Sequence, residues 1–224
     1  MTNTTDIAWI DQLEQLIQQK HMLSHRFYQA WTCGHLTKQV LQEYAQEYYH
    51  HVKAFPTYLS LLHSRSDDAA LRKCLLQNLI DEEAGEPNHP DLWRSFAMAL
   101  GVGPEEIASH VPRQETVELI NTFRTACSRP AVAVGIAVLY CYESQIPAIC
   151  HTKIEGLKKW YGLHHPDNYR YFTVHETADI EHSRVEKELL TRLVQPHEEK
   201  EVLGYAEKAL DALWKFLSSF TITV

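Results

Sequence analysis

The segment His175-Glu-Thr-Ala-Asp179-Ile-Glu-His182 places two imidazoles and a carboxylate at positions i, i+4 and i+7. On an α-helix, residues at these spacings project from one face within two turns. Imidazole combined with carboxylate suits iron, manganese or zinc. One helix cannot complete such a site, so facing helices must supply more ligands, as in the carboxylate-bridged helical bundles. The segment therefore predicts a helical bundle with a metal centre between its helices.

Hydrophobic residues recur with helical periodicity along almost the whole chain, and strand-like alternation is absent from the sequence. Pro56 and Pro147 fall inside long periodic segments, where a proline removes a backbone hydrogen bond and should kink the axis. No linker or composition shift divides the chain. We therefore expect one all-α domain over residues 1–224, with helices at about 6–20, 22–33, 37–63, 67–84, 90–100, 113–128, 130–161, 167–194 and 197–220.

Several residues mark the ends of these helices. Thr37 is suited to cap the helix that follows it, and Gly34 and Gly101 lie just after expected C-termini. Pro90 and Pro130 lie where a proline in the first turn costs no hydrogen bond.

Composition narrows the class of protein. The 224 residues are 45% hydrophobic, enough for a substantial core, and the net charge of -8 argues against a nucleic-acid partner. The longest apolar run, 131–142, is shorter than the ~20 residues that span a bilayer, and the first residues do not form a secretory signal. The cysteines are odd in number and form no CxxC motif, which is typical of a reducing compartment. We expect a soluble cytoplasmic protein without a membrane partner; its five cysteines are Cys33, Cys74, Cys127, Cys141 and Cys150.

Glu143 ends the apolar run that begins at Ala131. A helix that is apolar on nearly all sides is a core helix, so this carboxylate should be buried. A buried carboxylate must be protonated, paired with a cation or bound to a metal. Pairing with an arginine and binding to a metal are both open at this point.

The acidic cluster at residues 81–89 ends one helix and begins another at His89. Such a cluster is most often a solvated turn, with acids and asparagine in capping roles. Together with the other two segments it could add one glutamate and one histidine to a metal site. Spacing alone does not choose among Glu82, Glu83 and Glu86.

His25 offers a competing interpretation, because a histidine near aromatic residues in an N-terminal helix can be the proximal ligand of a haem. Acidic residues such as Glu143 and Asp179 would make an unusual haem pocket. The eleven tyrosines are also unusual, and most of them fit core positions with a partner for the hydroxyl.

The chain resembles the haem-oxygenase-like superfamily that includes the TenA and PqqC proteins, and within it the family of the Chlamydia protein associating with death domains. The resemblance runs from about Trp9 to Phe220 and implies a haem-oxygenase-like helical bundle with a dinuclear metal oxygenase site. The segments that carry it are 25–37, 44–56, 78–89 and 142–147. The metal ligands that it implies are Glu82, His89, Glu143, His175, Asp179 and His182.

The activity implied by this resemblance is the synthesis of 4-aminobenzoate for folate, in which the protein consumes its own side chains and each chain turns over once. Tyr28 matches the tyrosine that supplies the ring, and Lys153 matches the lysine that supplies the amino group. The cofactor would be two metal ions, Fe/Fe or Mn/Fe, with dioxygen and an external reductant as co-substrates. Zinc is excluded because it has no redox chemistry. Tyr142, Tyr171 and Tyr44 are placed to relay electrons or radicals, although packing roles are equally open.

The resemblance also implies a homodimer and no obligatory organic substrate. Without it, Lys153 would be interpreted as an exposed helix lysine and Tyr28 as a core tyrosine. Lys153 follows Glu143 by ten residues, ~15 Å along a straight helix, which is more than a lysine side chain spans. A kink or break at Pro147 could turn it toward the site.

Two other functions remain to be compared. A protein-binding module of the death-domain type has no need of six ligand residues from three segments, and the sequence ends at residue 224 without an extended tail. A TenA-like or PqqC-like enzyme would act on a small heterocycle, and hydrolysis of the TenA type needs a nucleophilic cysteine. The isolated cysteines form no constellation that would activate one.

Overall fold

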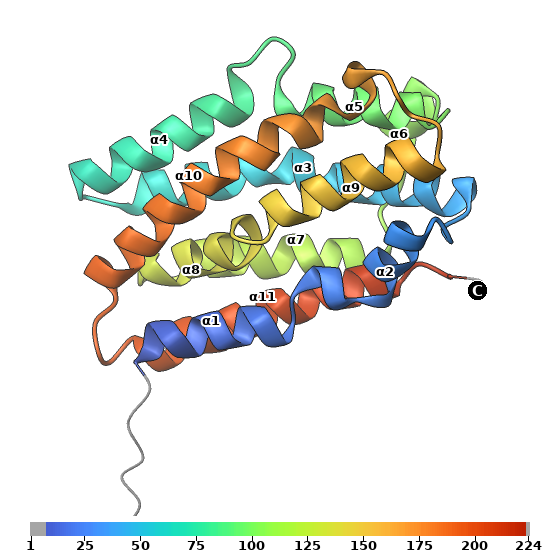
Figure 1. The fold of residues 1–224 in the computed structure, drawn as a ribbon. Helices are drawn as coiled ribbons and strands as arrows, with labels where there is room; N and C mark the ends of the chain where they lie inside the picture. Colours follow the sequence, from blue (N-terminus) through green and yellow to red (C-terminus); the bar gives the residue numbers. More distant parts are fainter. Residues whose placement is uncertain (1–7, 223–224) are drawn as a thin grey trace, which may run out of the picture.

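The computed structural model describes residues 8–222, and every regular element within that range is helical (Figure 1). The expected start of the first helix at residue 6 and most of the N-terminal stretch examined for a signal lie outside it. The α-helices are α1 (Trp9–Gln19), α2 (Arg26–Cys33), α3 (Lys38–Arg65), α4 (Ala69–Glu83), α5 (His89–Ala99), α6 (Pro104–Ser109), α7 (Gln114–Cys127), α8 (Val132–Glu143), α9 (Ile146–Trp160), α10 (Arg170–Leu193) and α11 (Glu199–Ser218), with 3-10 helices η1 (Met22–Ser24) and η2 (Pro166–Tyr169).

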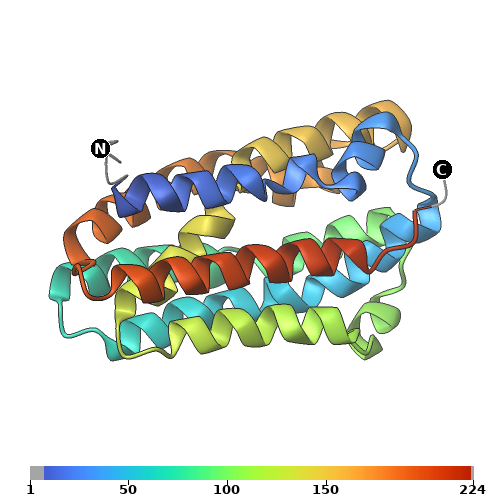
Figure 2. The same cartoon turned by 90° about the horizontal axis from the view of Figure 1, so that it is seen from below.

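These helices form one elongated bundle, which confirms the all-α prediction. Helix α10 packs against α5, α8 and α9, while α3 packs against α4, α5, α7 and α8. Helices α4 and α10 lie along one edge in Figure 1, and α1 and α11 lie along the opposite edge, where Figure 2 shows them from below. Helix α8 is buried along its length from Ala133 to Glu143, so it forms the centre of the core.

The helix ends follow the local chemistry of the sequence. The Thr37 hydroxyl accepts a hydrogen bond from the Val40 amide at 3.2 Å, and Gly34 ends α2 with a φ of 70° that disfavours other residues. Pro90 lies in the first turn of α5, as expected. Pro130 instead precedes α8, which begins at Val132, and the short helix α6 was not predicted.

The prediction of one helix over 130–161 is wrong, because α8 ends at Glu143 and α9 begins at Ile146. Pro147 lies in the first turn of α9, where its missing amide hydrogen costs no helical hydrogen bond. A new helix can therefore begin there. The buried Gln145 side chain stabilises the break: its amide donates to the Cys141 carbonyl at 2.6 Å and its oxygen accepts from the Met22 amide at 2.8 Å. The break changes the direction of α9, and it places Lys153 in the interior with 2% of its surface exposed.

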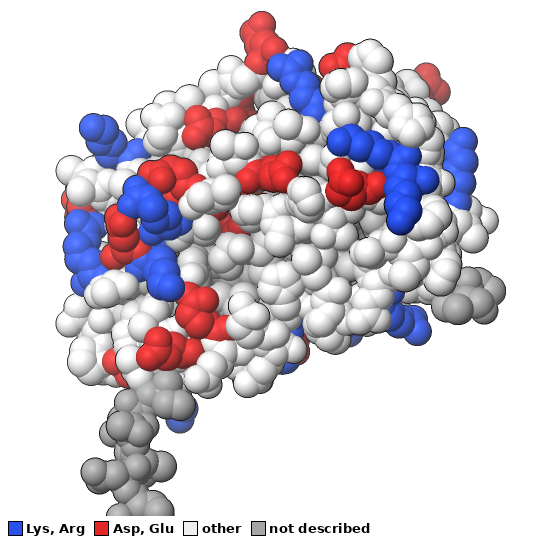
Figure 3. All heavy atoms as spheres, in the orientation of Figure 1, with Lys and Arg blue, Asp and Glu red and all other residues white. Residues whose placement is uncertain are grey.

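The stretch Val132–Trp160 is long and apolar enough to cross a membrane, but 78% of its most apolar window is buried inside the molecule. It comprises two core helices separated by the break, rather than a membrane span. On the face shown in Figure 3, acidic and basic side chains are interspersed.

Candidate metal centre and tyrosine cluster

Two groups of three side chains lie where α4, α5, α8 and α10 meet. In each group the possible ligand atoms lie within 4.8 Å of one another. Helix α10 contributes to both groups, α4 and α5 contribute to one, and the last residue of α8 contributes to the other. The first group is Glu82, His89 and His175, and the second group is Glu143, Asp179 and His182. The structure thus brings together all six residues that the resemblance implied.

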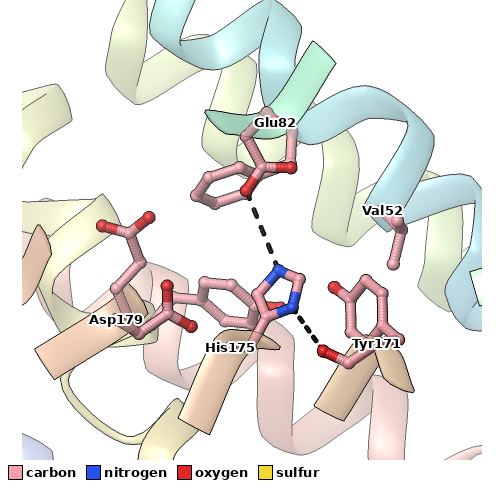
Figure 4. Close-up of a pocket in the computed structure, with 8 residues that line it drawn as sticks. Val52, Glu82, Tyr171, His175 and Asp179 are labelled. Atoms are coloured by element: carbon pink, nitrogen blue, oxygen red, sulfur yellow. Dashed lines mark hydrogen bonds and ion pairs between the residues drawn. The ribbon is translucent and has the colours of Figure 1, made fainter. Parts of the chain in front are cut away.

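The three side chains of the first group lie close together, with His89 Nδ1 3.0 Å from Glu82 Oε2. Figure 4 shows His175 between Glu82 and Tyr171, and its Nε2 lies 3.9 Å from Glu82 Oε1. His175 Nδ1 donates to the Tyr171 carbonyl at 2.8 Å, which leaves Nε2 free to act as a ligand, the arrangement usual for metal-binding histidines. Burial alone would raise the pKa of Glu82, but the neighbouring His175 and His89 rings outweigh it and lower that pKa to about 2.

The second group is richer in carboxylates. His182 Nδ1 lies 3.3 Å from Asp179 Oδ1 and 3.9 Å from Glu143 Oε1, and Asn78 Nδ2 donates to Glu143 Oε1 at 3.2 Å. Glu143 is buried, as the sequence predicted, with 1% of its surface exposed. Burial and the charge of Asp179 raise the pKa of Glu143 to about 7. This position therefore favours a cation beside the carboxylate.

The donor set of both groups fits a pair of transition-metal ions. Glu143 Oε2 and Asp179 Oδ2 are buried without any hydrogen-bond partner, although an unpaired buried carboxylate oxygen is costly. Histidine nitrogens and carboxylate oxygens are ligands of iron and manganese. A small cavity of about 10 Å³ lies between the groups and is lined by Val52, Phe55, Glu82, Tyr142, Glu143, Tyr171, His175 and Asp179.

A second buried cluster surrounds Lys153. Its Nζ donates to the Tyr44 hydroxyl at 2.7 Å, and the Tyr44 hydroxyl lies 3.3 Å from the Tyr28 hydroxyl. The same Nζ lies 4.8–5.7 Å from five ring centroids, those of Tyr28, Tyr44, Tyr48, Trp93 and Phe172. Burial lowers the pKa of Lys153 to about 8. The break before α9 thus turns Lys153 inward, but it brings the Lys153 amine to Tyr28 and Tyr44 rather than to the metal groups.

Tyr48 connects this cluster to the metal groups. Its ring stacks on Tyr44 with centroids 5.3 Å apart, and its hydroxyl lies 2.5 Å from that of Tyr142, which lines the small cavity. A parallel path leads from Tyr48 to Trp93 at 4.8 Å and from Trp93 to Tyr171 at 4.8 Å. Tyr171 in turn stacks on His175 with centroids 4.0 Å apart. The contacts are therefore continuous from Tyr28 to His175 of the first group and to Tyr142, which lines the small cavity beside the second group.

Sequence reasoning missed Tyr48 as well as the second-group neighbours Asn78 and Glu186. A signal was present for all three, because each shares a helix face with a predicted site residue. Tyr48 lies four residues after Tyr44, Glu186 lies four residues after His182, and Asn78 lies four residues before Glu82. Their partners, however, depend on how these helices pack against α8.

His25 has a structural role instead of one as a haem ligand. Its Nδ1 accepts from the Phe27 amide at 3.1 Å at the start of α2, and its Nε2 lies 2.9 Å from Ser218 Oγ. Both ring nitrogens are therefore occupied. The ring also packs edge-on against Trp214.

Proteins described as iron-containing redox enzymes form a family that matches residues 42–214 by sequence. The match includes all six candidate ligands. The chain belongs to this family. Membership agrees with the donor set, and iron-containing redox enzymes need a bound metal, which the buried carboxylates and imidazoles of this chain can hold.

Curated relatives are similar to this chain over nearly all of its length. The 4-aminobenzoate synthase of Chlamydia pneumoniae is 52% identical over 213 residues, 95% of each chain. The 4-aminobenzoate synthase of Nitrosomonas europaea is 44% identical over 216 residues, 92% of this chain and 88% of the relative.

Solved structures show that this chain has the TenA-like, haem-oxygenase-like fold. A TenA homologue from Pseudomonas syringae pv. tomato superimposes with a TM-score of 0.82 at 19% identity, over 94% of this chain and 91% of that one. A CADD-like protein of unknown function from Nostoc punctiforme superimposes with a TM-score of 0.72 at 19% identity, over 95% of this chain and 100% of that one. The fold and the family resemblance inferred from sequence are therefore confirmed.

Proposed function

We propose that this protein synthesises 4-aminobenzoate at a dinuclear metal centre, taking the aromatic ring from Tyr28 and the amino group from Lys153. The names of its relatives support the product, and the two ligand groups support two metal ions, Fe/Fe or Mn/Fe. Redox-active metals at these groups would supply the oxidising power by reducing dioxygen with electrons from an external reductant. The small cavity beside both groups has room for a molecule about the size of water.

The observation that carries the proposal is the position of Lys153. Among residues 8–222 no carboxylate forms an ion pair with it, and its Nζ reaches only into the tyrosine cluster. A buried lysine without an ion-pair partner costs stability, and a pKa of about 8 leaves part of the population as the neutral, nucleophilic amine at neutral pH. Lysines activated in this way are typical of covalent chemistry.

The direction from which Lys153 approaches agrees with the structure of the product. In 4-aminobenzoate the amino group is para to the carboxylate, and in tyrosine the hydroxyl is para to the side-chain carbon. The nitrogen must therefore replace the hydroxyl of Tyr28. Lys153 Nζ contacts Tyr44 OH, which in turn contacts Tyr28 OH, so the amine lies at the hydroxyl end of the ring.

We propose that Tyr142, Tyr171 and Tyr44 relay electrons between the metal groups and Tyr28, with Tyr48 as the link between them. Their side chains are buried, and burial raises the pKa of each hydroxyl, so the phenols stay protonated. Each oxidation of such a phenol must move a proton as well. The short contact between the Tyr48 and Tyr142 hydroxyls provides a path for that proton.

The remaining expectations are proposals as well. We place the reaction in the cytoplasm, with no nucleic acid, no membrane and no obligatory organic substrate, and the working unit is a homodimer. Free thiols at all five cysteines agree with a reducing compartment.

A hydrolase of the TenA type is disfavoured by the cysteines. Cys127, Cys141 and Cys150 are buried, and burial raises the pKa of each, that of Cys127 to about 12. A thiol with a raised pKa is a poor nucleophile. The six metal-site residues, five of them buried, would also have no purpose in a death-domain-type binding module.

The proposal is tested by loading purified protein with iron and manganese, adding reductant and dioxygen, and measuring 4-aminobenzoate by mass spectrometry. Tyr28→Phe and Lys153→Arg should abolish the product. Tyr58→Phe, which alters a buried tyrosine of α3 outside the Lys153 cluster, should not. Undiminished product from the first two variants would contradict self-sacrifice. Unchanged metal content in a His175→Ala, Asp179→Ala double variant would contradict the site.

A further inference from the structure

The α10 face that carries three of the candidate ligands continues for one more turn. Glu186 follows His182 by four residues and Asp179 by seven, so its side chain lies on the same face. It is buried, with 7% of its surface exposed, and its carboxyl group interacts with that of Glu143. The six residues implied by the family resemblance do not include it.

Glu186 makes the second group rich in hydrogen-bond acceptors and poor in hydrogen-bond donors. Three carboxyl groups lie together there, and Asn78 and His182 are the side chains that approach Glu143 and Asp179 as donors. Glu143 Oε2, Asp179 Oδ2 and Glu186 Oε2 are all buried without a hydrogen-bond partner. In the described part of the chain no lysine or arginine forms an ion pair with any of the three. Such a cluster must take up protons or surround a cation.

The two groups consequently offer different ligands. The first group has two imidazoles and one carboxylate, while the second has one imidazole and, with Glu186, three carboxylates. Imidazole suits iron, and carboxylate with water suits manganese. The second group also borders an open groove of about 590 Å³ between α4 and α10, to which Asn78, Asp81, His182 and Glu186 contribute, so water and ions can reach it.

We propose that Glu186 is a fourth carboxylate of the metal centre and that it makes the second group the manganese position, with iron at Glu82, His89 and His175. This inference rests on the dinuclear centre of the proposed function. With Glu186, the four carboxylates of the two groups balance the charge of two divalent ions, so the buried centre is neutral overall. Without it, one positive charge would remain in the interior.

The test uses the full-length protein, freed of metal and then loaded with equimolar ferrous iron and manganese without oxygen. Anomalous diffraction recorded at the absorption edges of the two metals should place manganese between Glu143, Asp179 and His182 with the Glu186 carboxylate bound to it. Iron should lie at the first group. Iron at the second group, or a Glu186 side chain turned away from the metal, would overturn the inference.

Glu186→Gln is the matched variant, because it keeps the size of the side chain and removes its charge. It should weaken manganese binding about tenfold to a hundredfold in calorimetric titration and allow iron to occupy both groups. Glu188→Gln, an exposed position on the same helix, should change neither. Unchanged affinity and selectivity in a folded Glu186→Gln protein would overturn the inference and leave the proposed function intact. Failure of the unaltered protein to bind two metals would overturn both.

Discussion

Lys153 Nζ lies 2.7 Å from the Tyr44 hydroxyl, in a pocket whose other walls are aromatic rings. This lysine is on α9 and the tyrosine is on α3, and they meet because the chain breaks between α8 and α9. The contact joins the hydroxyl end of Tyr28 to a primary amine in a water-poor interior. Both the reactivity of this amine and its cost to stability can be measured.

The rate of 4-aminobenzoate formation should rise between about pH 7 and pH 9. Burial lowers the pKa of Lys153 to about 8, so the fraction of neutral amine increases through this range. Single-turnover product yields at early times, measured by mass spectrometry across this range, report the rate. A rate that is flat or falls through pH 8, with metal occupancy constant, would contradict a nucleophilic role for the Lys153 amine.

Lys153→Met should stabilise the fold at neutral pH by roughly 1 to 3 kcal/mol. The folded-state pKa of about 8 lies below the ordinary lysine value of 10.5, so the unfolded chain binds the proton more tightly. The penalty is complete below about pH 8 and disappears as the pH rises to 10.5, while lost contacts with the ring faces offset part of the gain. Urea denaturation at pH 7 and pH 10 measures the gain. An equal gain at both pH values would show that the buried charge of Lys153 is not its cause.

Tyr48→Phe should lower product formation about a hundredfold and leave metal content unchanged. The ring that stacks on Tyr44 remains, but the hydroxyl that contacts Tyr142 is lost, and with it a path for a proton. The intact mass of the chain would then show Tyr28 unconsumed. Tyr58→Phe removes a buried hydroxyl near His51 and serves as the control. Equal yields from both variants would exclude Tyr48 from the relay.

Gln145→Ala should destabilise the protein by about 1 to 3 kcal/mol, because the buried Met22 amide loses its acceptor. The same change should reduce product yield, since the Gln145 side chain fixes the break that directs Lys153 inward. Thermal unfolding and product yield are measured together. Lost stability with full yield would show that the break does not depend on this side chain.

Much of the fold, and the grouping of several candidate ligands, was predictable from sequence because both depend on local periodicity. His175, Asp179 and His182 share a helix face whatever the rest of the chain does, and an apolar helix around Glu143 must be buried. The choice of Glu82 over its acidic neighbours depended on the resemblance, since a turn with several acids does not reveal which one faces inward.

The parts that could not be predicted depend on tertiary packing. Pro147 indicated a disturbance, but the break at Ser144 and Gln145 is stabilised by Met22, which is distant in sequence. The burial of Lys153 follows from that break, so an ordinary exposed lysine was the reasonable expectation from sequence alone. Tyr48 and Glu186 shared faces with predicted residues, yet their roles depend on Tyr142 and Glu143 of another helix.

The origin of the product atoms tests the central claim most directly. Protein is produced with ring-labelled carbon-13 tyrosine and side-chain-labelled nitrogen-15 lysine, loaded with iron and manganese, and given reductant and dioxygen in unlabelled buffer. We expect 4-aminobenzoate that carries both labels, with a corresponding loss at Tyr28 and Lys153 in the intact chain. Unlabelled 4-aminobenzoate, or product formed while both side chains remain whole, would contradict the self-sacrifice of these two residues.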